Sequence, residues 1–395
     1  MKKLRTLGLL LTFLCSLALA PLSEEQAPRW PWFKKHQLDP GANEAATVAD
    51  INKDGRLDIV SGENWFEAPD WRKHRMRDIP FLNGYIDDFS NFALDVNGDG
   101  FPDIVACAWF SKKLSWYENP RRFDGELANA LWKEHVIETG FNYELMLMVD
   151  VDGDGKAQEI LPNYGSSGEI VWWERAEPLS KGEWVRRVVG KIPDAKGLHG
   201  VGCGDLNGDG HPDILTSRGW FEGPENPRTG SWKFHPDFEL LAPRRQISPI
   251  YVQDVNGDGR NDLVYGAAHQ YGVFWLENAG SKWVPHVIDD SWSQAHAFTL
   301  VDLDRDGKLD IVTGKRYLAH DVDPGAYEPL GLYWYRLNPG GTYTKHVLDF
   351  GTQTGAGMQT PVLDIDGDGD LDLVAPGKSG LFLFEQVNFP RQRQP

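Results

Sequence analysis

The amino-acid sequence predicts an all-β fold made of seven repeated units. A carboxylate-rich motif recurs seven times at intervals of 45 to 62 residues. Short apolar segments of strand type flank each copy, and a segment rich in Trp, Tyr and Phe follows most copies. Four strands in each of seven units fit a seven-bladed β-propeller, in which four-stranded antiparallel blades pack radially around a central channel.

Each unit supplies its strands in a constant order. In the second unit, residues 92–94 precede the motif, an Asp-Ile-Val segment follows it, and residues 116–119 and 132–137 supply the third and fourth strands. The last unit ends after its third strand at residues 381–384, whereas residues 32–36 form a strand without a unit of its own. We therefore expect the N-terminal strand to join the last blade and close the ring, which leaves no unpaired edge at the join.

The repeated motif has the composition of a loop that binds a hard cation. Its first, third and fifth positions carry Asp or Asn, its sixth position is Gly, and its ninth position is Asp in six copies. Oxygens at alternate positions of a tight loop converge on one point, Gly permits the sharp turn, and a later carboxylate closes the shell. Turn formation alone would not require the ninth acid. We expect up to seven Ca²⁺ ions.

The expected calcium ligands form seven sets. They are Asp50, Asn52, Asp54 and Asp58; Asp95, Asn97, Asp99 and Asp103; Asp150, Asp152, Asp154 and Glu159; Asp205, Asn207, Asp209 and Asp213; Asp254, Asn256, Asp258 and Asp262; Asp302, Asp304, Asp306 and Asp310; and Asp364, Asp366, Asp368 and Asp372. In the third copy the ninth position is Gln158 and the acid follows as Glu159, so we expect a distorted or weaker site there. An EF-hand is excluded, because position twelve is never Glu.

Composition and charge narrow the function classes. The 395 residues carry a formal net charge of −18, which opposes nucleic acid as a partner. Three cysteines cannot form a disulfide scaffold. Much of the acidity belongs to the seven loops, so bound Ca²⁺ would offset it and an anionic sugar polymer stays open as a ligand.

The first residues have the layout of an export signal. Lys2, Lys3 and Arg5 precede an apolar run over residues 7–19, and Ala18 and Ala20 are small residues suited to cleavage. We expect residues 1–20 to be a signal peptide and residues 21–395 to form one propeller domain, secreted or periplasmic. No later stretch has the length of a membrane span. We expect a monomer.

The seven motif copies resemble the FG-GAP or VCBS-type repeat propellers. That family includes the integrin α-subunit head, whose blades carry the same Asp-x-Asp/Asn-x-Asp-Gly-x-x-Asp calcium loop. The resemblance spans about residues 28–388. The sequence is also similar to the propellers of secreted polysaccharide lyases and of aldos-2-ulose dehydratase. The resemblance implies a fold and leaves the activity open, because this fold hosts many functions.

The resemblance also implies where a functional site would lie. In such propellers the calcium loop joins the first two strands of a blade on one face, so residues before strand one and between strands two and three lie on the opposite face. A long insertion over residues 314–325 falls there. We expect catalytic roles for His199, His296, Lys315, Arg316 and His320. We expect ligand contacts from Asp88, Tyr143, Glu144, Arg244, Gln246, His269 and Tyr317.

Two functions fit these residues. The first is binding of a carbohydrate or an extracellular protein on the face opposite the calcium loops. The alternative is a carbohydrate lyase or dehydratase, with His199 or His296 as base and Lys315 or Arg316 polarising the group beside the abstracted proton. Two or three His with a carboxylate would also suit an additional transition metal at the central channel.

Another group of histidines is expected to be structural. His36, His135, His286 and His346 recur at one place in the outer strand of their units, as repeat architecture does. The chain contains no nucleophile elbow, phosphate loop or dinucleotide fingerprint, so nucleophilic hydrolysis and nucleotide chemistry lack support.

Overall fold

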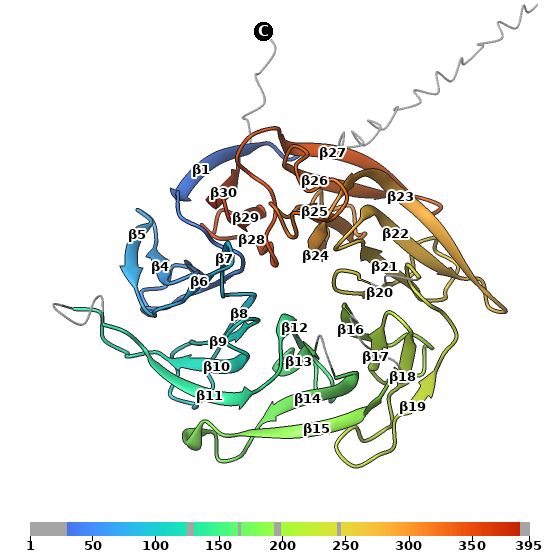
Figure 1. The fold of residues 1–395 in the computed structure, drawn as a ribbon, viewed down its shortest axis with the longest axis horizontal. Coiled ribbons are helices and arrows are strands. Elements are labelled where there is room, and N and C mark those ends of the chain that lie inside the picture. The colour runs from blue at the N-terminus through green and yellow to red at the C-terminus, as the bar shows by residue number, and fades with distance from the viewer. Residues whose placement is uncertain (1–29, 125–129, 165–166, 193–198, 243–245, 388–395) are drawn as a thin grey trace, which may run out of the picture. The chain divides into compact units, whose positions relative to one another are not determined.

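Seven four-stranded antiparallel sheets are arranged in a ring in the described part of the chain (Figure 1). The structure is a computed structural model that describes residues 30–124, 130–164, 167–192, 199–242 and 246–387. The expected seven-bladed β-propeller is therefore correct. A short two-stranded sheet lies between blades 1 and 2, and the 3₁₀ turn η2 (Leu179–Lys181) connects the third and fourth strands of blade 3. The described residues form no helix with the length and apolarity needed to cross a membrane.

The blades follow one another along the chain, each with its inner strand first. Blade 1 contains β2 (Ala46–Ala49), β3 (Asp58–Ser61), β4 (Asn64–Glu67) and β5 (Arg72–Arg75). Blade 2 contains β8 (Ser90–Leu94), β9 (Asp103–Ala108), β10 (Lys113–Glu118) and β11 (Lys133–Thr139). Blade 3 contains β12 (Tyr143–Val149), β13 (Glu159–Tyr164), β14 (Glu169–Arg175) and β15 (Trp184–Lys191). Blade 4 contains β16 (Val201–Gly204), β17 (Asp213–Thr216), β18 (Gly219–Glu222) and β19 (Lys233–His235).

The remaining blades keep this order until the last one. Blade 5 contains β20 (Tyr251–Gln253), β21 (Asp262–Gly266), β22 (Tyr271–Asn278) and β23 (Trp283–Ser293). Blade 6 contains β24 (Ala295–Val301), β25 (Asp310–Lys315), β26 (Gly331–Asn338) and β27 (Thr342–Phe350). Blade 7 contains β28 (Val362–Leu363), β29 (Asp372–Gly377), β30 (Gly380–Gln386) and, as its outer strand, β1 (Phe33–Asp39).

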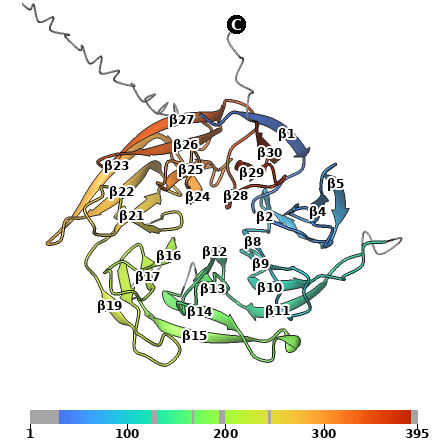
Figure 2. The same ribbon diagram turned by 180° about the vertical axis from the view of Figure 1, so that it is seen from behind.

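Strand β1 brings the start of the described chain onto its last blade. It pairs antiparallel with β30, with Phe33 opposite Gln386 and Asp39 opposite Leu381. Seen from behind, β1 again lies along the outside of β30 (Figure 2). The pairing covers an edge of β30 that would otherwise expose its backbone N–H and C=O groups.

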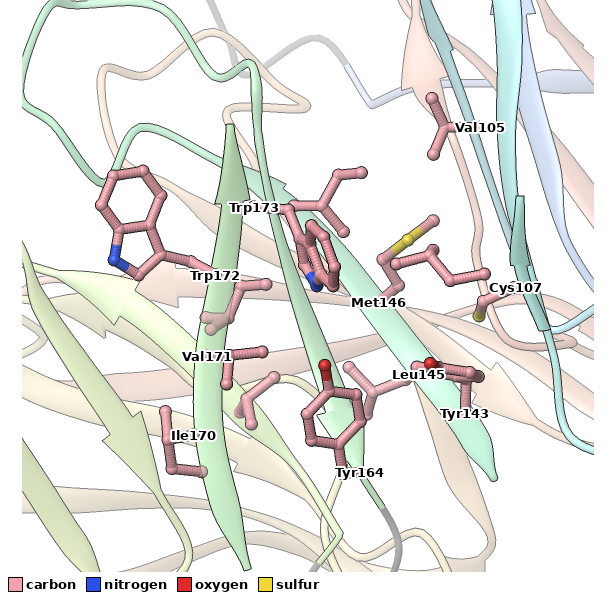
Figure 3. Packing of buried hydrophobic residues seen from close by; sticks show 14 of the residues in the cluster. Val105, Cys107, Tyr143, Leu145, Met146, Tyr164, Ile170, Val171, Trp172 and Trp173 are labelled. Atoms are coloured by element: carbon pink, nitrogen blue, oxygen red, sulfur yellow. The ribbon is translucent and has the colours of Figure 1, made fainter. Parts of the chain in front are cut away.

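Apolar side chains are buried between neighbouring blades rather than in one central core. The largest cluster joins blades 2, 3 and 4, where Val105, Met146 and Trp172 are almost fully buried (Figure 3). Five further clusters fill the spaces between the other neighbouring blades. Burial of this apolar surface provides the main driving force for packing one blade on the next.

An outer histidine binds the third strand in most blades. In blade 2 the His135 ring stacks on Trp116 with 4.1 Å between ring centroids, and its Nε2 lies 2.9 Å from an oxygen of Glu118. Equivalent stacks are formed by Trp65 and His74, Trp220 and His235, Trp275 and His286, and Trp334 and His346. His36 contacts Glu385 on the neighbouring strand at 2.6 Å. These histidines belong to the blade architecture.

The connection from blade 1 to blade 2 folds as a small hairpin. Strands β6 (Phe81–Leu82) and β7 (Tyr85–Ile86) pair across Asn83 and Gly84, which both have positive φ. Asn-Gly is the preferred pair for a tight hairpin turn of this kind. The hairpin brings Tyr85 to the centre of the ring, as described below.

Replacing His135 should destabilise blade 2. We expect His135→Ala to lower the free energy of unfolding by about 1–2 kcal/mol, because the variant loses a ring stack and a hydrogen bond to a carboxylate. Urea unfolding followed by Trp fluorescence measures the change. Lys133→Ala, an exposed change on the same strand, is the control. Equal effects of the two substitutions would contradict a role for the stack.

Candidate functional site

The seven acidic loops share one hydrogen-bond pattern. In the first loop, Asp50 accepts the backbone N–H groups of Asp54 and Gly55 at 3.0 Å, and Asn52 accepts that of Asp54 at 3.0 Å. The other six loops repeat these contacts within 0.2 Å where the same pairs occur. The side-chain oxygens of positions one, three and five are therefore held on one side of each loop, as a hard cation requires.

The ninth-position carboxylate connects each loop to the third strand of its blade. Asp103 accepts the N–H of Val96 at 3.0 Å with one oxygen and that of Asn119 at 2.8 Å with the other. Asp58, Asp213, Asp262 and Asp372 make the same two contacts with their own loops and third strands. Each of these carboxylates therefore joins the loop of its blade to the third strand of the same blade, and it also faces the other acidic side chains of the loop.

The third loop reaches the same arrangement by a different side chain. Glu159 stands one residue later than the usual Asp, yet its longer side chain accepts the N–H of Val151 at 3.1 Å. Its carboxylate also lies within 4.8 Å of ligand oxygens from Asp150 and Asp152. The extra methylene compensates for the shift of one residue, so the loop keeps a cluster that could hold a metal ion. Comparable groups are Asp302, Asp304 and Asp306, and Asp364, Asp366 and Asp372.

A second cluster lies at the opposite ends of the inner strands. Strand β12 carries Glu144 near its start and leads to the acidic loop at its end, so the two kinds of site are on opposite faces. Around Glu144 the structure gathers three histidines from three blades: His199 before β16, His269 before β22, and His296 in β24. All four side chains are buried, and one ligand atom of each lies within 4.8 Å of those of the others.

The three imidazoles point the same nitrogen at one oxygen. The Nε2 atoms of His199, His269 and His296 lie 3.3, 3.8 and 3.8 Å from Oε1 of Glu144. The rings are 5.0 to 5.5 Å apart between centroids. The Nε2 atoms of His199 and His296 form no hydrogen bond with any described residue.

The other nitrogen of each ring has an acceptor. Nδ1 of His199 contacts the carbonyl oxygen of Ile247, Nδ1 of His269 lies 2.8 Å from Oδ2 of Asp323, and Nδ1 of His296 lies 3.4 Å from the carbonyl oxygen of Gln294. Carbonyl and carboxylate oxygens only accept hydrogen bonds. These contacts therefore place a proton on Nδ1 and turn the lone pair of Nε2 toward Glu144. Metal-binding histidines have their outer nitrogen held in the same way.

Electrostatics agree with a site that requires a cation. Burial, followed by the charge of Arg316, lowers the pKa of His296 well below its usual value. Burial opposes ionisation of Glu144, but the neighbouring His199 and His269 bring the pKa of its carboxyl well below the usual value. An Nε2 lone pair that points at a carboxylate oxygen repels it at these distances. A metal ion among them would turn that repulsion into coordination.

Arg316 borders the cluster on one side. Its Nε donates to Oε2 of Glu44 at 2.9 Å, and its Nη1 lies 3.6 Å from Oε1 of Glu144. Both Arg316 and Glu44 are buried. The Arg316 guanidinium therefore links the first blade to the cluster.

Three half-buried side chains border the cluster near Arg316. Tyr85 donates its hydroxyl to the carbonyl oxygen of Ala319 and lies 3.5 Å from Nδ1 of His320. The Nζ atom of Lys378 lies 3.4 Å from the centroid of the Tyr85 ring. The His320 ring stacks on His269 at 4.5 Å between centroids. Burial, then the neighbouring His269, lowers the pKa of His320 to about 4, so this ring is neutral at pH 7.

A cavity of about 300 Å³ lies on the loop side of the cluster. The inner strands line it, with Leu145, Ile250, Phe298 and Met358 in its wall. Leu145 directly follows Glu144, so the cavity begins one residue beyond the cluster. Its largely apolar wall keeps the polar cluster apart from the acidic loops.

Several residues expected at the site lie elsewhere. The Lys315 Nζ donates to Oγ of Ser293 at 2.9 Å and to the carbonyl oxygen of Gly325 at 2.6 Å, so it anchors the long loop of blade 6. Asp88 pairs with Arg77 at 3.0 Å. Tyr143 is fully buried and donates to Glu138 at 2.8 Å, so it offers no face to a sugar ring.

The remaining predicted contacts are distributed around the long loop. Gln246 lies beside the cluster, because its backbone bridges to His199. Tyr317 is 41% exposed on the long loop. Arg244 lies outside the described residues. Of the residues expected at the site, the structure brings together His199, His269, His296, His320, Glu144 and Arg316.

The site also contains residues that sequence reasoning left out. Tyr85, Glu44 and Lys378 border the cluster, and Asp323 orients His269. The Asn83-Gly84 turn signal could have marked the hairpin that carries Tyr85. Glu44 stands six residues before Asp50, as Glu144 stands before Asp150, so its place in the repeat could have marked it. The contacts of Lys378 and Asp323 form only when segments from different blades meet.

The acidic loops should make stability depend on pH and calcium together. Burial, with neighbouring carboxylates, raises the pKa of Asp58 to about 6 and that of Asp103 to about 7 in the absence of metal. A carboxyl whose pKa is higher in the folded state favours folding while protonated, so stability is lost as pH rises from about 4 to about 7. Bound Ca²⁺ would offset the added charge.

We therefore expect calcium to raise the melting temperature more at pH 7 than at pH 5. Thermal unfolding of metal-stripped protein, with and without added CaCl₂, measures this difference. Asp99→Asn, which removes a fifth-position charge, should reduce the calcium effect. Asp103→Asn should lower stability even without calcium by roughly 2 kcal/mol, because an amide cannot accept two backbone N–H groups through both of its terminal atoms. A calcium effect of equal size at both pH values would contradict this account.

Comparisons with known proteins agree with the fold. Residues 150–216 and 254–313 match the FG-GAP-like repeat family. No curated protein matches the chain. Similar solved structures include BBS1N in complex with ARL6DN, which is 12% identical with a TM-score of 0.52 over 91% of this chain and 96% of that chain.

Two other solved structures are similar at lower TM-scores. A lectin of Agrocybe aegerita that recognises non-reducing terminal N-acetylglucosamine is 17% identical, with a TM-score of 0.48 over 91% of this chain and 86% of the lectin. The exotype rhamnogalacturonan lyase YesX is 10% identical, with a TM-score of 0.47 over 90% of this chain and 73% of the lyase. Identities this low concern the fold alone. The chain is a seven-bladed β-propeller in which residues 150–216 and 254–313 are similar to FG-GAP-like repeats.

Proposed function

We propose that the propeller binds a divalent transition metal through Glu144, His199, His269 and His296 and acts as a lyase or dehydratase on a carbohydrate. One observation carries the proposal. Three Nε2 atoms face one carboxylate oxygen at 3.3 to 3.8 Å, while each Nδ1 has its own acceptor. A metal ion would coordinate these buried donors and stabilise their arrangement.

The donor set narrows the identity of the metal. Imidazole nitrogens suit Zn, Fe, Cu and Ni, and a carboxylate extends the range to Mn. Three imidazoles and a carboxylate exclude Ca²⁺ as the preferred ion at this site, because Ca²⁺ takes oxygen ligands. A bound metal would polarise a carbonyl oxygen of the substrate and acidify the neighbouring C–H group.

The geometry reassigns the general base. The sequence favoured His199 or His296, but both direct Nε2 at the shared Glu144 oxygen and would be occupied by the metal. His320 lies beside the cluster, is half-buried and is neutral at pH 7. We assign proton abstraction to His320, with Tyr85 close to its Nδ1 atom. The electron pair of the C–H bond would form a C=C bond as the C–O bond on the next carbon breaks, and the leaving oxygen would take a proton from water. Arg316 would stabilise negative charge that develops on the substrate oxygen.

The acidic loops and the N-terminal residues complete the proposal. The loop geometry supports Ca²⁺ at up to seven sites, which would stabilise the blades without joining the chemistry. The charged and apolar pattern of residues 1–20 supports export, so that the protein would work in a secreted or periplasmic setting.

A second candidate is ligand binding without chemistry. Phe81 and Leu82 are 62% and 41% exposed on the hairpin that carries Tyr85. Exposed apolar side chains beside a polar site are typical of a surface that binds a partner or a sugar. The first candidate predicts that incubation with the protein converts a sugar into a product. The second predicts that the ligand is bound and stays unchanged.

Metal analysis tests the central site. We expect purified protein to contain one transition metal ion per chain in addition to calcium, measured by inductively coupled plasma mass spectrometry. The double variant His199→Ala, His296→Ala should lose this ion and keep its calcium, because the acidic loops lie on the other face. His286→Ala, an outer histidine, should keep both. Wild-type protein that binds no transition metal after incubation with Zn²⁺ or Mn²⁺ would overturn the proposal.

Replacing His320 tests the chemistry. Incubation with acidic polysaccharides, sugar acids and keto-sugars should produce ultraviolet absorbance from an unsaturated product. We expect His320→Asn to lower this rate by about 100-fold with the transition metal still bound, because the variant loses its base. His346→Asn, on the outer strand of the same blade, should keep the rate. Binding without any product would favour the second candidate.

A further inference from the structure

We infer that the ligand of the central site carries a carboxylate group, which Arg316 and Lys378 bind beside the metal. This inference rests on the proposed function and adds the chemical class of the substrate: a sugar acid rather than a neutral sugar. It depends on the hydrogen-bond state of Arg316, the shape of its surroundings and the balance of charge.

Arg316 presents unused hydrogen-bond donors to the cluster. Its guanidinium is 1% exposed, and its Nη1 and Nη2 atoms have no hydrogen-bond partner among the described residues. Among the described side chains, Nε alone donates a hydrogen bond, to Oε2 of Glu44 at 2.9 Å, whereas Nη1 is at ion-pair distance from Oε1 of Glu144, 3.6 Å away. Leaving the donors of a buried charged group unpaired is costly, so native sites supply an acceptor from a ligand or water. The edge of the guanidinium that carries Nη1 and Nη2 therefore points to an anionic oxygen ligand.

Two aromatic rings hold this edge in place. The Cζ atom of Arg316 lies 5.3 Å from the centroid of Phe89 and 5.5 Å from that of Tyr85. Nη1 also lies 3.6 Å from the metal-facing oxygen of Glu144. A fixed guanidinium presents two parallel N–H donors, which match the two oxygens of a carboxylate. A group bound there would lie next to the metal.

Lys378 places a second cation in the same region. Its Nζ lies 3.8 Å from Oε1 of Glu44 and donates to the carbonyl oxygen of Leu318 at 2.6 Å. Glu44 is thus shared by two cations. With a divalent metal bound, the formal positive charges of Arg316, Lys378 and the metal exceed by one the negative charges of Glu44, Glu144 and Asp323, and a ligand carboxylate would neutralise this excess.

A carboxylate fits better than a phosphate. The described edge offers one guanidinium and one ammonium, and no described helix begins there. The nearby Gly-Ala-Gly segment, residues 355–357, already uses the N–H of Ala356 for the carbonyl oxygen of Lys315. Phosphate sites usually add such backbone donors to satisfy three oxygens. The guanidinium of Arg316 and the ammonium of Lys378 match the two oxygens of one planar carboxylate.

Binding measurements with matched sugars test this inference. Calorimetric titration of the metal-loaded full chain would use D-galacturonate, D-glucuronate and D-gluconate, with D-galactose, D-glucose and D-glucitol as neutral counterparts. We expect at least one acid to bind about tenfold or more tightly than its neutral counterpart, as charged hydrogen bonds imply. Acids and neutral sugars of equal affinity, or tighter binding of galactose 6-phosphate, would overturn the inference.

Two substitutions locate the contact. Arg316→Met should abolish the preference for the acid, and Lys378→Met should reduce it by about tenfold, with neutral sugars unaffected. Lys34→Met, an exposed change on β1, is the charge-matched control. Because Arg316 is buried, the half-buried Lys378 tests the inference if the first variant does not fold. An acid preference that survives in Lys378→Met and in a folded Arg316→Met would also overturn it.

The metal content of the protein distinguishes failure of the proposed function from failure of the carboxylate inference. Protein that binds no transition metal contradicts the proposed function. Protein that binds the metal but shows no preference for acids contradicts only the carboxylate inference.

Discussion

A buried carboxylate that binds two backbone segments at once is the constraint on which the blades depend. Asp103 connects its loop to the third strand through Val96 and Asn119, and four other blades repeat both contacts with Asp. The two N–H groups are buried and need a strong acceptor, and a carboxylate with an oxygen for each meets that need. The acid therefore has a structural use whether or not a cation is bound.

The same constraint determines where the inner strands end, because each acidic loop directly follows its inner strand. A loop held against its own blade directs its inner strand along the ring axis, and the far ends of these strands then meet at the centre. Glu144, His199 and His296 meet there although they come from blades 3, 4 and 6. The repeat thus separates two chemistries in space: oxygen-rich loops on one face, and imidazoles with cations on the other.

The long loop of blade 6 adapts this shared scaffold to one site. Lys315 binds Gly325 across the loop, and Asp323 orients His269 from the same loop. Tyr85 reaches the loop from the hairpin between blades 1 and 2. These contacts are side-chain hydrogen bonds between segments that are distant in sequence, and they complete the environment of the cluster without changing any blade.

The sequence by itself determined the seven blades, because the motif, its spacing and its flanking strands are local patterns repeated often enough to exclude other folds. It also indicated His199, His269, His296 and Glu144, since their place in the repeat predicts their face. Only the tertiary structure decided that their Nε2 atoms and Oε1 face one another, that Lys315 and Tyr143 turn away, and that Tyr85, Glu44 and Lys378 join the site. Side-chain direction and contacts across the ring depend on packing between blades, which no single repeat encodes.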